Sequence, residues 1–261
     1  MMRSLYIATT GMSAQQTAIE VISHNLANVS TTGFKRSSAE FHDLLYQTFR
    51  PAGAQRTSGI LPVGIQVGLG VQPMSAHKLF EQGSLEHTHN PLDIAIEGDG
   101  FFQVQLPNGD TAYTRTGSFE LDDTGTIMTP DGFPLLPNIS VPSGMVDLAI
   151  SPEGVVSGVL AGATVSTVIG TIELARFINP AGLDSLGKNL YQETTASGGP
   201  TTGTPGLESF GQLRHNFLEG SNVDIANEMV NMIVAQRAYE LNSKAIQTSD
   251  EMLSLVNTLK R

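Results

Sequence analysis

His87 and His89 are the residues whose spacing could most readily support chemistry, because alternate positions of a strand put both imidazoles on one face. With Glu86 or Asp93 as a third ligand, the pair could begin a zinc site. No second cluster joins them, since cysteine is absent and the remaining histidines are scattered at positions 24, 42, 77 and 215. The sequence therefore favours solvent-exposed histidines, and we expect no metal site.

The other candidate catalytic residues do not form a recognisable catalytic set. Asp122 and Asp123 are adjacent carboxylates of the kind that glycosidases use as acid and base, but hairpins commonly carry such residues in solvent. The glycines around Asp99 do not have phosphate-loop spacing, and no Gly-x-Ser-x-Gly motif is present. We therefore expect no catalytic residues and no cofactor, with a glycan-acting enzyme as the minor alternative.

The charge balance excludes other classes of partner. The chain has 261 residues with 14 Lys and Arg against 25 Asp and Glu, a formal net charge of -11. Binding to nucleic acid or to an anionic membrane needs a basic surface, so neither is expected. Between residues 93 and 153 ten carboxylates (93, 97, 99, 110, 120, 122, 123, 131, 147 and 153) face one base, Arg115, which predicts an outward-facing module.

Two segments resemble targeting signals, one a secretory signal and one a membrane helix, but neither has the required length or composition. The apolar run at residues 5–8 is too short for a cleaved secretory signal. Residues 154–172 carry no charge over 19 positions, but their glycines and β-branched residues favour strands joined by turns over a membrane helix.

Both ends of the chain are predicted to be helical. The first thirty residues carry a heptad pattern of Leu5, Ala8, Met12, Gln15, Ile19, Ile22, Leu26 and Val29. Such a pattern indicates either a seam that faces a partner helix or an amphipathic helix on a globular core. At the other end, Ser221 and Asp224 form a capping signature before a stretch without Gly or Pro, which predicts a helix of about 38 residues, roughly 55 Å long.

The C-terminal helix is predicted to be apolar on two faces. One stripe consists of Ile225, Met232, Tyr239, Ile246 and Leu253, and the other, about 200° around the helix, of Val234, Ala238, Leu241, Ala245, Met252, Leu255 and Leu259. We expect Tyr239 and Leu253 to pack toward the N-terminal heptad. Leu241, Met252 and Leu255 would then contact neighbouring copies of the same chain, because an uncovered apolar stripe would otherwise face solvent.

The middle of the chain is predicted to be β-rich. Residues 92–96 and 101–106 have strand patterns, and turn signals follow at Asn108-Gly109, Asp123-Thr-Gly125 and Asp131-Gly132. Residues 49–73 and 194–209, rich in Gly, Pro or Thr, are expected to be extended or loop segments.

The expected fold class is therefore α+β and multi-domain: the terminal helices form a coiled-coil core, and an all-β domain is inserted between them. We expect residues 1–33 plus 222–261 to form a discontinuous helical core (polymerisation) domain. Residues 34–85 plus 207–221 would be an extended connecting segment, and residues 86–206 a β-rich outer domain.

Several long motifs resemble the flagellar rod and hook family. They are residues 23–35 (SHNLANVSTTGFK), 218–224 (LEGSNVD) and 228–240 (EMVNMIVAQRAYE) near the ends, and 90–102 (NPLDIAIEGDGFF) and 113–119 (YTRTGSF) in the middle. The resemblance covers nearly the whole chain and is weakest over residues 141–209. His24 stands where Asn or Gln is expected, and residues 181–205 match no pattern of the family.

The resemblance implies a role and a set of residues. Within the family, the chain is most similar to distal-rod subunits, with hook or proximal-rod subunits as the alternative. Helical assembly residues would be Leu5, Met12, Ile19, Ile22, Asn25, Leu26, Asn28, Met232, Tyr239, Leu241, Ile246, Met252, Leu253 and Leu255, and a rod-straightening segment would contain Leu61, Pro62, Gly64, Gly68 and Gly70.

The resemblance also implies partners and a location. The subunit would polymerise with itself and meet proximal-rod proteins, the hook protein, and the rings of the outer membrane and peptidoglycan. It would leave the cell through the flagellar export apparatus without a cleaved signal peptide and form a torque-transmitting tube across the periplasm.

Overall fold

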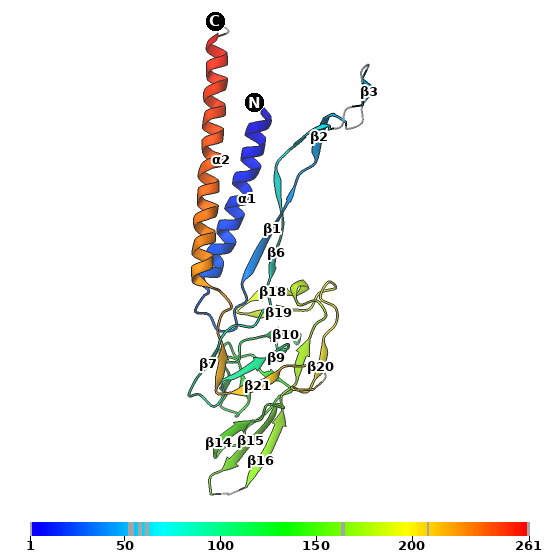
Figure 1. Ribbon diagram of the computed structural model, residues 1–261. Coiled ribbons are helices and arrows are strands. Elements are labelled where there is room, and N and C mark those ends of the chain that lie inside the picture. The colour runs from blue at the N-terminus through cyan, green and yellow to red at the C-terminus, as the bar shows by residue number, and fades with distance from the viewer. Residues whose placement is uncertain are drawn as a thin grey trace. The chain divides into compact units, whose positions relative to one another are not determined.

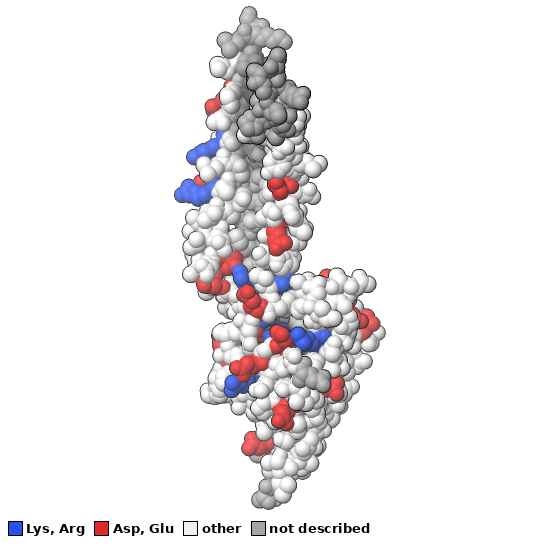
Figure 2. All heavy atoms as spheres, turned by 45° about the vertical axis from the view of Figure 1, so that its right-hand side comes forward, with Lys and Arg blue, Asp and Glu red and all other residues white. Residues whose placement is uncertain are grey.

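The computed structural model describes residues 2–51, 55–56, 59–60, 63–162, 165–207 and 209–259. The chain forms two compact units. The helical unit contains Met1–Ala27, Ser37–His77 and Asp224–Arg261, and the β unit contains Asn28–Arg36 and Lys78–Val223. The three-region division expected from the sequence has different boundaries and stays a prediction. Acidic side chains are scattered over the visible surface (Figure 2), in keeping with the net charge of -11.

The helical unit contains two antiparallel helices, α1 (Met2–Ala27) and α2 (Ile225–Leu259) (Figure 1). With 35 residues, α2 is close to the length predicted. Its cap differs from the expected pair: the Asp224 carboxylate accepts hydrogen bonds from the backbone N–H of Ala226 (2.9 Å) and Asn227 (3.3 Å). The Ser221 hydroxyl instead accepts from the N–H of Val223, so Asp224 alone begins the helix. None of the helices in the described residues is long and apolar enough to cross a membrane.

A two-stranded ribbon completes the helical unit. β1 (Ser37–Asp43) pairs with β6 (Val71–Lys78), β2 (Tyr46–Arg50) with β5 (Ile65–Gly68), and β3 (Gln55–Arg56) with β4 (Gly59–Ile60). The described part of residues 49–73 is therefore extended, as expected, but it is paired and not a loop. The Pro and Gly residues that suggested a loop are compatible with strands here because a two-stranded ribbon consists only of edges.

The β unit is built on one larger sheet. Its strand order is β18 (Asp184–Gly187), β19 (Leu190–Gln192), β10 (Thr111–Thr114), β9 (Phe101–Gln105), β17 (Leu174–Arg176) and β20 (Thr201–Gly203), with β13 (Leu135–Leu136) also pairing with β9. β14 (Met145–Ile150), β15 (Val155–Leu160) and β16 (Ser166–Thr171) form a three-stranded sheet, which confirms strands and not a membrane helix within residues 154–172.

Short strand pairs and one helical turn complete this unit. β8 (Ile94–Glu97) pairs with β21 (Gln212–His215), β7 (Leu85–His87) with β22 (Phe217–Glu219), and β11 (Glu120–Leu121) with β12 (Ile127–Met128); the 3-10 helix η1 is Pro180–Gly182. The predicted turn at Asn108-Gly109 connects β9 to β10, and Gly109 has a φ of 90° that favours glycine.

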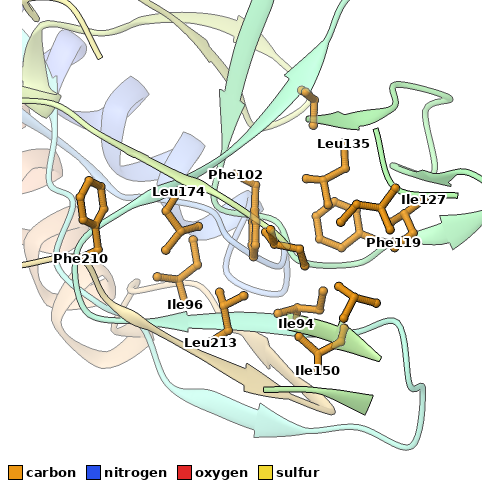
Figure 3. Packing of buried hydrophobic residues seen from close by; sticks show 14 of the residues in the cluster. Ile94, Ile96, Phe102, Phe119, Ile127, Leu135, Ile150, Leu174, Phe210 and Leu213 are labelled. Carbon is orange, nitrogen blue, oxygen red and sulfur yellow. The ribbon is translucent and has the colours of Figure 1, made fainter. Parts of the chain in front are cut away.

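Two apolar clusters lie on opposite faces of β9, because alternate side chains of a strand point in opposite directions. Phe102 belongs to the larger cluster, where it lies with Ile94, Ile96, Phe119, Ile127, Leu135, Leu174 and Leu213 (Figure 3). Phe101 belongs to an aromatic cluster with Tyr113, Phe177 and Tyr191. The β unit thus has its own core, and β9 contributes side chains to both of its clusters.

Candidate assembly surface

The seam between α1 and α2 is lined by small and polar residues. The Ser4 and Ser249 hydroxyls are 3.4 Å apart, and the Asn25 amide donates to the Glu228 carboxylate over 3.5 Å. Between these pairs, a Cβ built on Gly11 would lie 2.9 Å from the Asn242 amide nitrogen, so the helices approach closely there. The contacting positions are multiples of seven apart on both helices, as in an antiparallel coiled coil. We call these three pairs the inner seam.

In the apolar heptad expected in α1, Leu5, Met12, Ile19 and Leu26 each lie one residue after a position in register with the inner seam, and Ile22 lies three residues before Asn25. Leu5, Met12, Ile19, Ile22 and Leu26 are each half-buried. A one-residue offset rotates a side chain by about 100° around a helix, and an offset of three residues back places it about 60° away on the same side, so these residues flank the seam. Their remaining exposed area is available to a neighbouring molecule.

Two other predicted residues of this end are engaged locally. The Asn25 side chain is 1% exposed; its amide donates to the Ser37 carbonyl and its carbonyl accepts from the Ser37 N–H, each at 2.8 Å. Asn25 therefore holds the start of β1 beside the end of α1. Asn28 is half-buried, and its side-chain oxygen accepts a hydrogen bond from the Thr31 hydroxyl.

The two predicted stripes of α2 differ in exposure. Met232, Ile246 and Leu253 are half-buried, and Tyr239 is 37% exposed. Opposite the inner seam lies what we call the outer apolar face, six large side chains that are 49% to 66% exposed: Val230, Ile233, Val234, Leu241, Met252 and Leu255. At 100° per residue they fall within about one third of the circumference of the helix, so they form a continuous stripe.

The ribbon that contains the predicted rod-straightening segment also exposes apolar side chains: Leu45, Tyr46, Phe49, Val63 and Ile65 are all at least half exposed. Gly70 has a φ of 127° and lies against Thr10 of α1, where a Cβ would overlap the threonine hydroxyl. Gly68 packs against the Tyr46 ring and Gly64 is half-buried. Leu61 and Pro62 lie outside the described residues.

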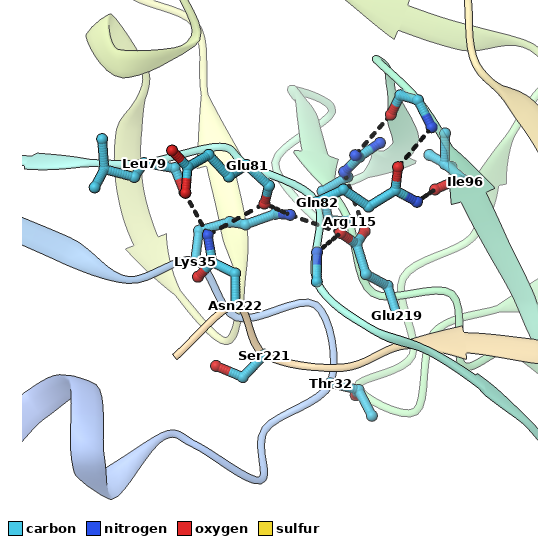
Figure 4. Close-up of polar contacts among 12 residues, drawn as sticks. Thr32, Lys35, Leu79, Glu81, Gln82, Ile96, Arg115, Glu219, Ser221 and Asn222 are labelled. Carbon is cyan, nitrogen blue, oxygen red and sulfur yellow. Dashed lines mark hydrogen bonds and ion pairs between the residues drawn. The ribbon is translucent and has the colours of Figure 1, made fainter. Parts of the chain in front are cut away.

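The β unit contains a buried ionic cluster that sequence reasoning missed. The Lys35 ammonium donates to one oxygen of Glu219 at 2.7 Å, and the Arg115 Nε lies 3.3 Å from the other (Figure 4). All three side chains are at most 4% exposed. We call them the junction cluster, because they join the segment after α1 to the segment before α2.

Backbone groups complete the junction cluster. Lys35 also donates to the Glu81 carbonyl, Arg115 donates to the carbonyls of Gly98 (2.7 Å) and Gly100 (2.8 Å), and Glu219 accepts from the Gly83 N–H. Burial lowers the pKa values of Lys35 and of Arg115, because both cations lose hydration, while Glu219 acts in the opposite direction.

Asn222 extends the network beside the cluster. Its amide donates to the carbonyls of Leu79 and Glu81, and its side-chain oxygen accepts from the Arg36 N–H at 2.8 Å. Residues 32–36, 79–83 and 219–222 are therefore held to one another by side chains that satisfy buried backbone groups.

The only sequence signal for this cluster was the resemblance itself. Lys35, Arg115 and Glu219 each lie in a motif that carried it, namely residues 23–35, 113–119 and 218–224. Lys35 and Glu219 are 184 positions apart, so no local pattern could reveal their contact.

The pair of His87 and His89 packs against an aromatic side chain. The His87 and His89 rings meet edge-on with their centroids 5.6 Å apart, and His87 also packs against Phe217. Within the described ranges, no group of three or more His, Cys, Asp or Glu side chains could hold a metal ion.

Comparison with known proteins gives matches in three parts of the chain. Residues 5–35 match the family described as flagella basal body rod protein, residues 95–158 the D1 domain of the flagellar hook protein FlgE/F/G, and residues 214–259 the C-terminal part of the flagellar basal body rod FlgEFG proteins. A solved hook protein, FlgE2 of Helicobacter pylori, is 16% identical and covers 70% of this chain and 43% of its own, but the TM-score of 0.24 is too low to support an argument.

Relatives match over their full length. The flagellar basal-body rod protein FlgG of Buchnera aphidicola (subsp. Acyrthosiphon pisum) is 52% identical over 99% of this chain and 100% of its own. The FlgG proteins of Borreliella burgdorferi and Bacillus subtilis are 51% and 40% identical, each over 100% of both chains. The chain therefore belongs to the FlgG family of flagellar basal-body rod proteins, structural rod subunits of the bacterial flagellum.

Proposed function

We propose that this chain is a subunit of the distal rod, where it polymerises into a rigid helical tube that transmits torque from motor to hook. The observation that carries the proposal is the outer apolar face of α2. A stripe of six large, half-exposed side chains is costly in water and is typical of a surface that another protein covers. Copies of the same chain are the natural cover for a subunit of a shaft.

In this proposal, different surfaces of α1 and α2 make the contacts within one subunit and the contacts between subunits. The inner seam of small and polar residues sets how α1 and α2 pair within one subunit, while the outer apolar face and the flanking residues of α1 meet neighbours. Contacts between different surfaces need not close into a ring, so they extend into an open helical polymer. Burying one side chain of this size contributes about 1.5–3 kcal/mol, and repetition along a tube makes the sum large. The role requires neither catalysis nor a cofactor.

The proposal includes the surroundings of the rod. We infer that the subunit crosses the periplasm within the basal body, contacts proximal-rod and hook proteins at the ends of the tube, and turns inside the peptidoglycan and outer-membrane rings. Export through the flagellar apparatus without a cleaved signal peptide completes this hypothesis. Family membership supports it through the names of the relatives, which are basal-body rod proteins.

The Gly-rich ribbon is proposed to keep the tube straight, and deletion of residues 61–73 is therefore expected to give curved, hook-like polymers. The physical reason is that the ribbon packs on α1 at Gly70 and exposes large apolar side chains such as Leu45 and Phe49 to a neighbour. Electron microscopy of isolated rods measures the curvature. Straight rods from the deletion strain would contradict this role.

The experiment that tests the proposed function is electron microscopy of basal bodies from a strain lacking this gene. A short rod without a hook is expected, and re-expression of the chain from a plasmid should restore both. A complete rod that lacks only the hook would favour a hook subunit instead. Loss of the whole rod would favour a proximal-rod subunit.

A further inference from the structure

The β unit carries a hollow that the proposed function does not use. Two neighbouring cavities, of about 150 Å³ and about 230 Å³, share the lining residues Arg176, Phe177 and Ile178. Ile178 is 94% exposed although it is a large apolar residue, and Phe177 beneath it is 3% exposed. We call these two cavities and their rim the Arg176 hollow. Aromatic and arginine side chains, both of which line the hollow, are enriched at protein interfaces.

The smaller cavity has a positive lining in an acidic protein. Arg115 and Arg176 contribute two guanidinium groups, and Asp99 contributes the single carboxylate. Behind the lining, Arg115 shares Glu219 with Lys35, so the junction cluster itself holds two cations and one anion. A carboxylate that entered the cavity would therefore meet uncompensated positive charge.

Arg176 is available to such a carboxylate. Three other exposed or half-exposed bases of the β unit are ion-paired: Arg36 with Glu81, Lys188 with Asp131 and Arg214 with Glu97. The Arg176 guanidinium, by contrast, has neither a hydrogen-bond acceptor nor an ion-pair partner in the described part of the chain, and the side chain is exposed. Its charge can thus be satisfied by another molecule without breaking an existing contact.

The chain itself supplies a segment of matching chemistry. β11 and the start of the turn that joins it to β12 carry Glu120, Leu121, Asp122 and Asp123, all exposed, and Leu121 is 44% exposed between carboxylates. Glu120 and Asp123 have no ion-pair partner within the described ranges. The turn is rigid, because the Asp122 N–H donates to the Thr126 carbonyl and the Gly125 N–H to the Asp122 carbonyl.

We propose that the acidic turn of one subunit docks into the Arg176 hollow of a second copy, with Asp123 beside Arg176 and Leu121 against Ile178. Opposite charges give such a contact its orientation, and the apolar pair excludes water from it. Since the two surfaces differ, the contact repeats from subunit to subunit along a polymer. The inference rests on the proposed function. It adds a contact between the β units of neighbouring copies to the contact that the outer apolar face of α2 makes.

Disulfide crosslinking tests the contact directly, because the chain contains no cysteine of its own. Leu121→Cys and Ile178→Cys are placed together in the full chain, and rods isolated from motile cells are oxidised. A ladder of linked subunits is expected from the double variant and none from either single variant. Rods that assemble but give no ladder would overturn this inference while leaving the rod function intact. A band linking Ile178→Cys to a different protein would overturn it too.

Charge exchange provides the second test. Arg176→Glu and Asp123→Lys should each weaken the affinity of one such contact about tenfold, the effect of losing one well-placed interfacial charge pair, and should therefore lower the number of hook-bearing basal bodies. The two changes together should restore most of that loss, because the pair is re-formed with its signs exchanged. Arg176→Lys, which keeps the charge, is the matched control and should assemble normally. Two neutral single variants, or a double variant no better than either, would refute the contact.

Discussion

At the scale of single residues, the junction cluster has an uneven charge balance with measurable consequences. Glu219 is the one anion between two buried cations, so Glu219→Gln leaves Lys35 and Arg115 as unpaired like charges. We expect a loss of about 3–5 kcal/mol in the free energy of unfolding of the β unit. Lys35→Met leaves the Arg115–Glu219 pair intact and should cost less, about 1–3 kcal/mol. Urea unfolding of the full chain, followed by near-ultraviolet circular dichroism, compares the two variants. A larger loss from Lys35→Met would contradict the assigned charge balance.

The lowered pKa of Lys35 gives this residue a pH signature. Between its lowered pKa in the folded state and the ordinary value of 10.5, the unfolded chain binds the proton while the folded chain does not. Stability rises with pH wherever the unfolded state binds more protons. The wild type should therefore gain stability relative to Lys35→Met as the pH rises toward 10.5. The measurement is the difference between their urea midpoints at a series of alkaline pH values, and a constant difference would refute the shift.

At the scale of secondary-structure elements, the inner seam predicts which glycine matters in α1. Gly11 faces the Asn242 side chain so closely that Gly11→Leu must push the helices apart. Overpacking of this kind costs about 1–3 kcal/mol and should reduce the number of hook-bearing basal bodies. Asn242→Ala in the same chain makes room and should restore assembly in part. Gly11→Ala is the control, because the Asn242 amide can rotate away and alanine favours the helix. Normal assembly of Gly11→Leu would show that the helices are not this close.

The elements were predictable to different degrees, for physical reasons. The two terminal helices and strands such as β9 follow from periodicity in the sequence, which depends only on neighbouring residues. The inner seam does not, because Ser4, Gly11 and Asn25 resemble surface residues, and the apolar heptad drew attention to positions one residue away. The pairing of Lys35 with Glu219 was equally hidden, since it depends on the path of the chain through the whole β unit. Local patterns thus indicated the elements but not the residues that hold them together.

At the scale of the whole molecule, polymerisation through α2 predicts a clear separation between folding and assembly. Leu241 is 66% exposed in the middle of the outer apolar face, so Leu241→Asp removes only a small part of the packing within the subunit itself. In the polymer the same change would bury a carboxylate among apolar side chains, which costs several kcal/mol at every subunit contact. We therefore expect a soluble, folded subunit that forms no rod.

The measurement of this last prediction combines two readouts on the same variant. Near-ultraviolet circular dichroism of the purified chain should show a folded β unit, whose aromatic cluster is separate from α2. Electron microscopy of basal bodies should show no distal rod. Leu241→Met is the matched control, because it keeps an apolar side chain of similar volume and should give normal rods. If Leu241→Asp also formed normal rods, the outer apolar face would not be the polymerisation surface, and exposed apolar side chains of the ribbon such as Leu45 and Phe49 would become the next candidates.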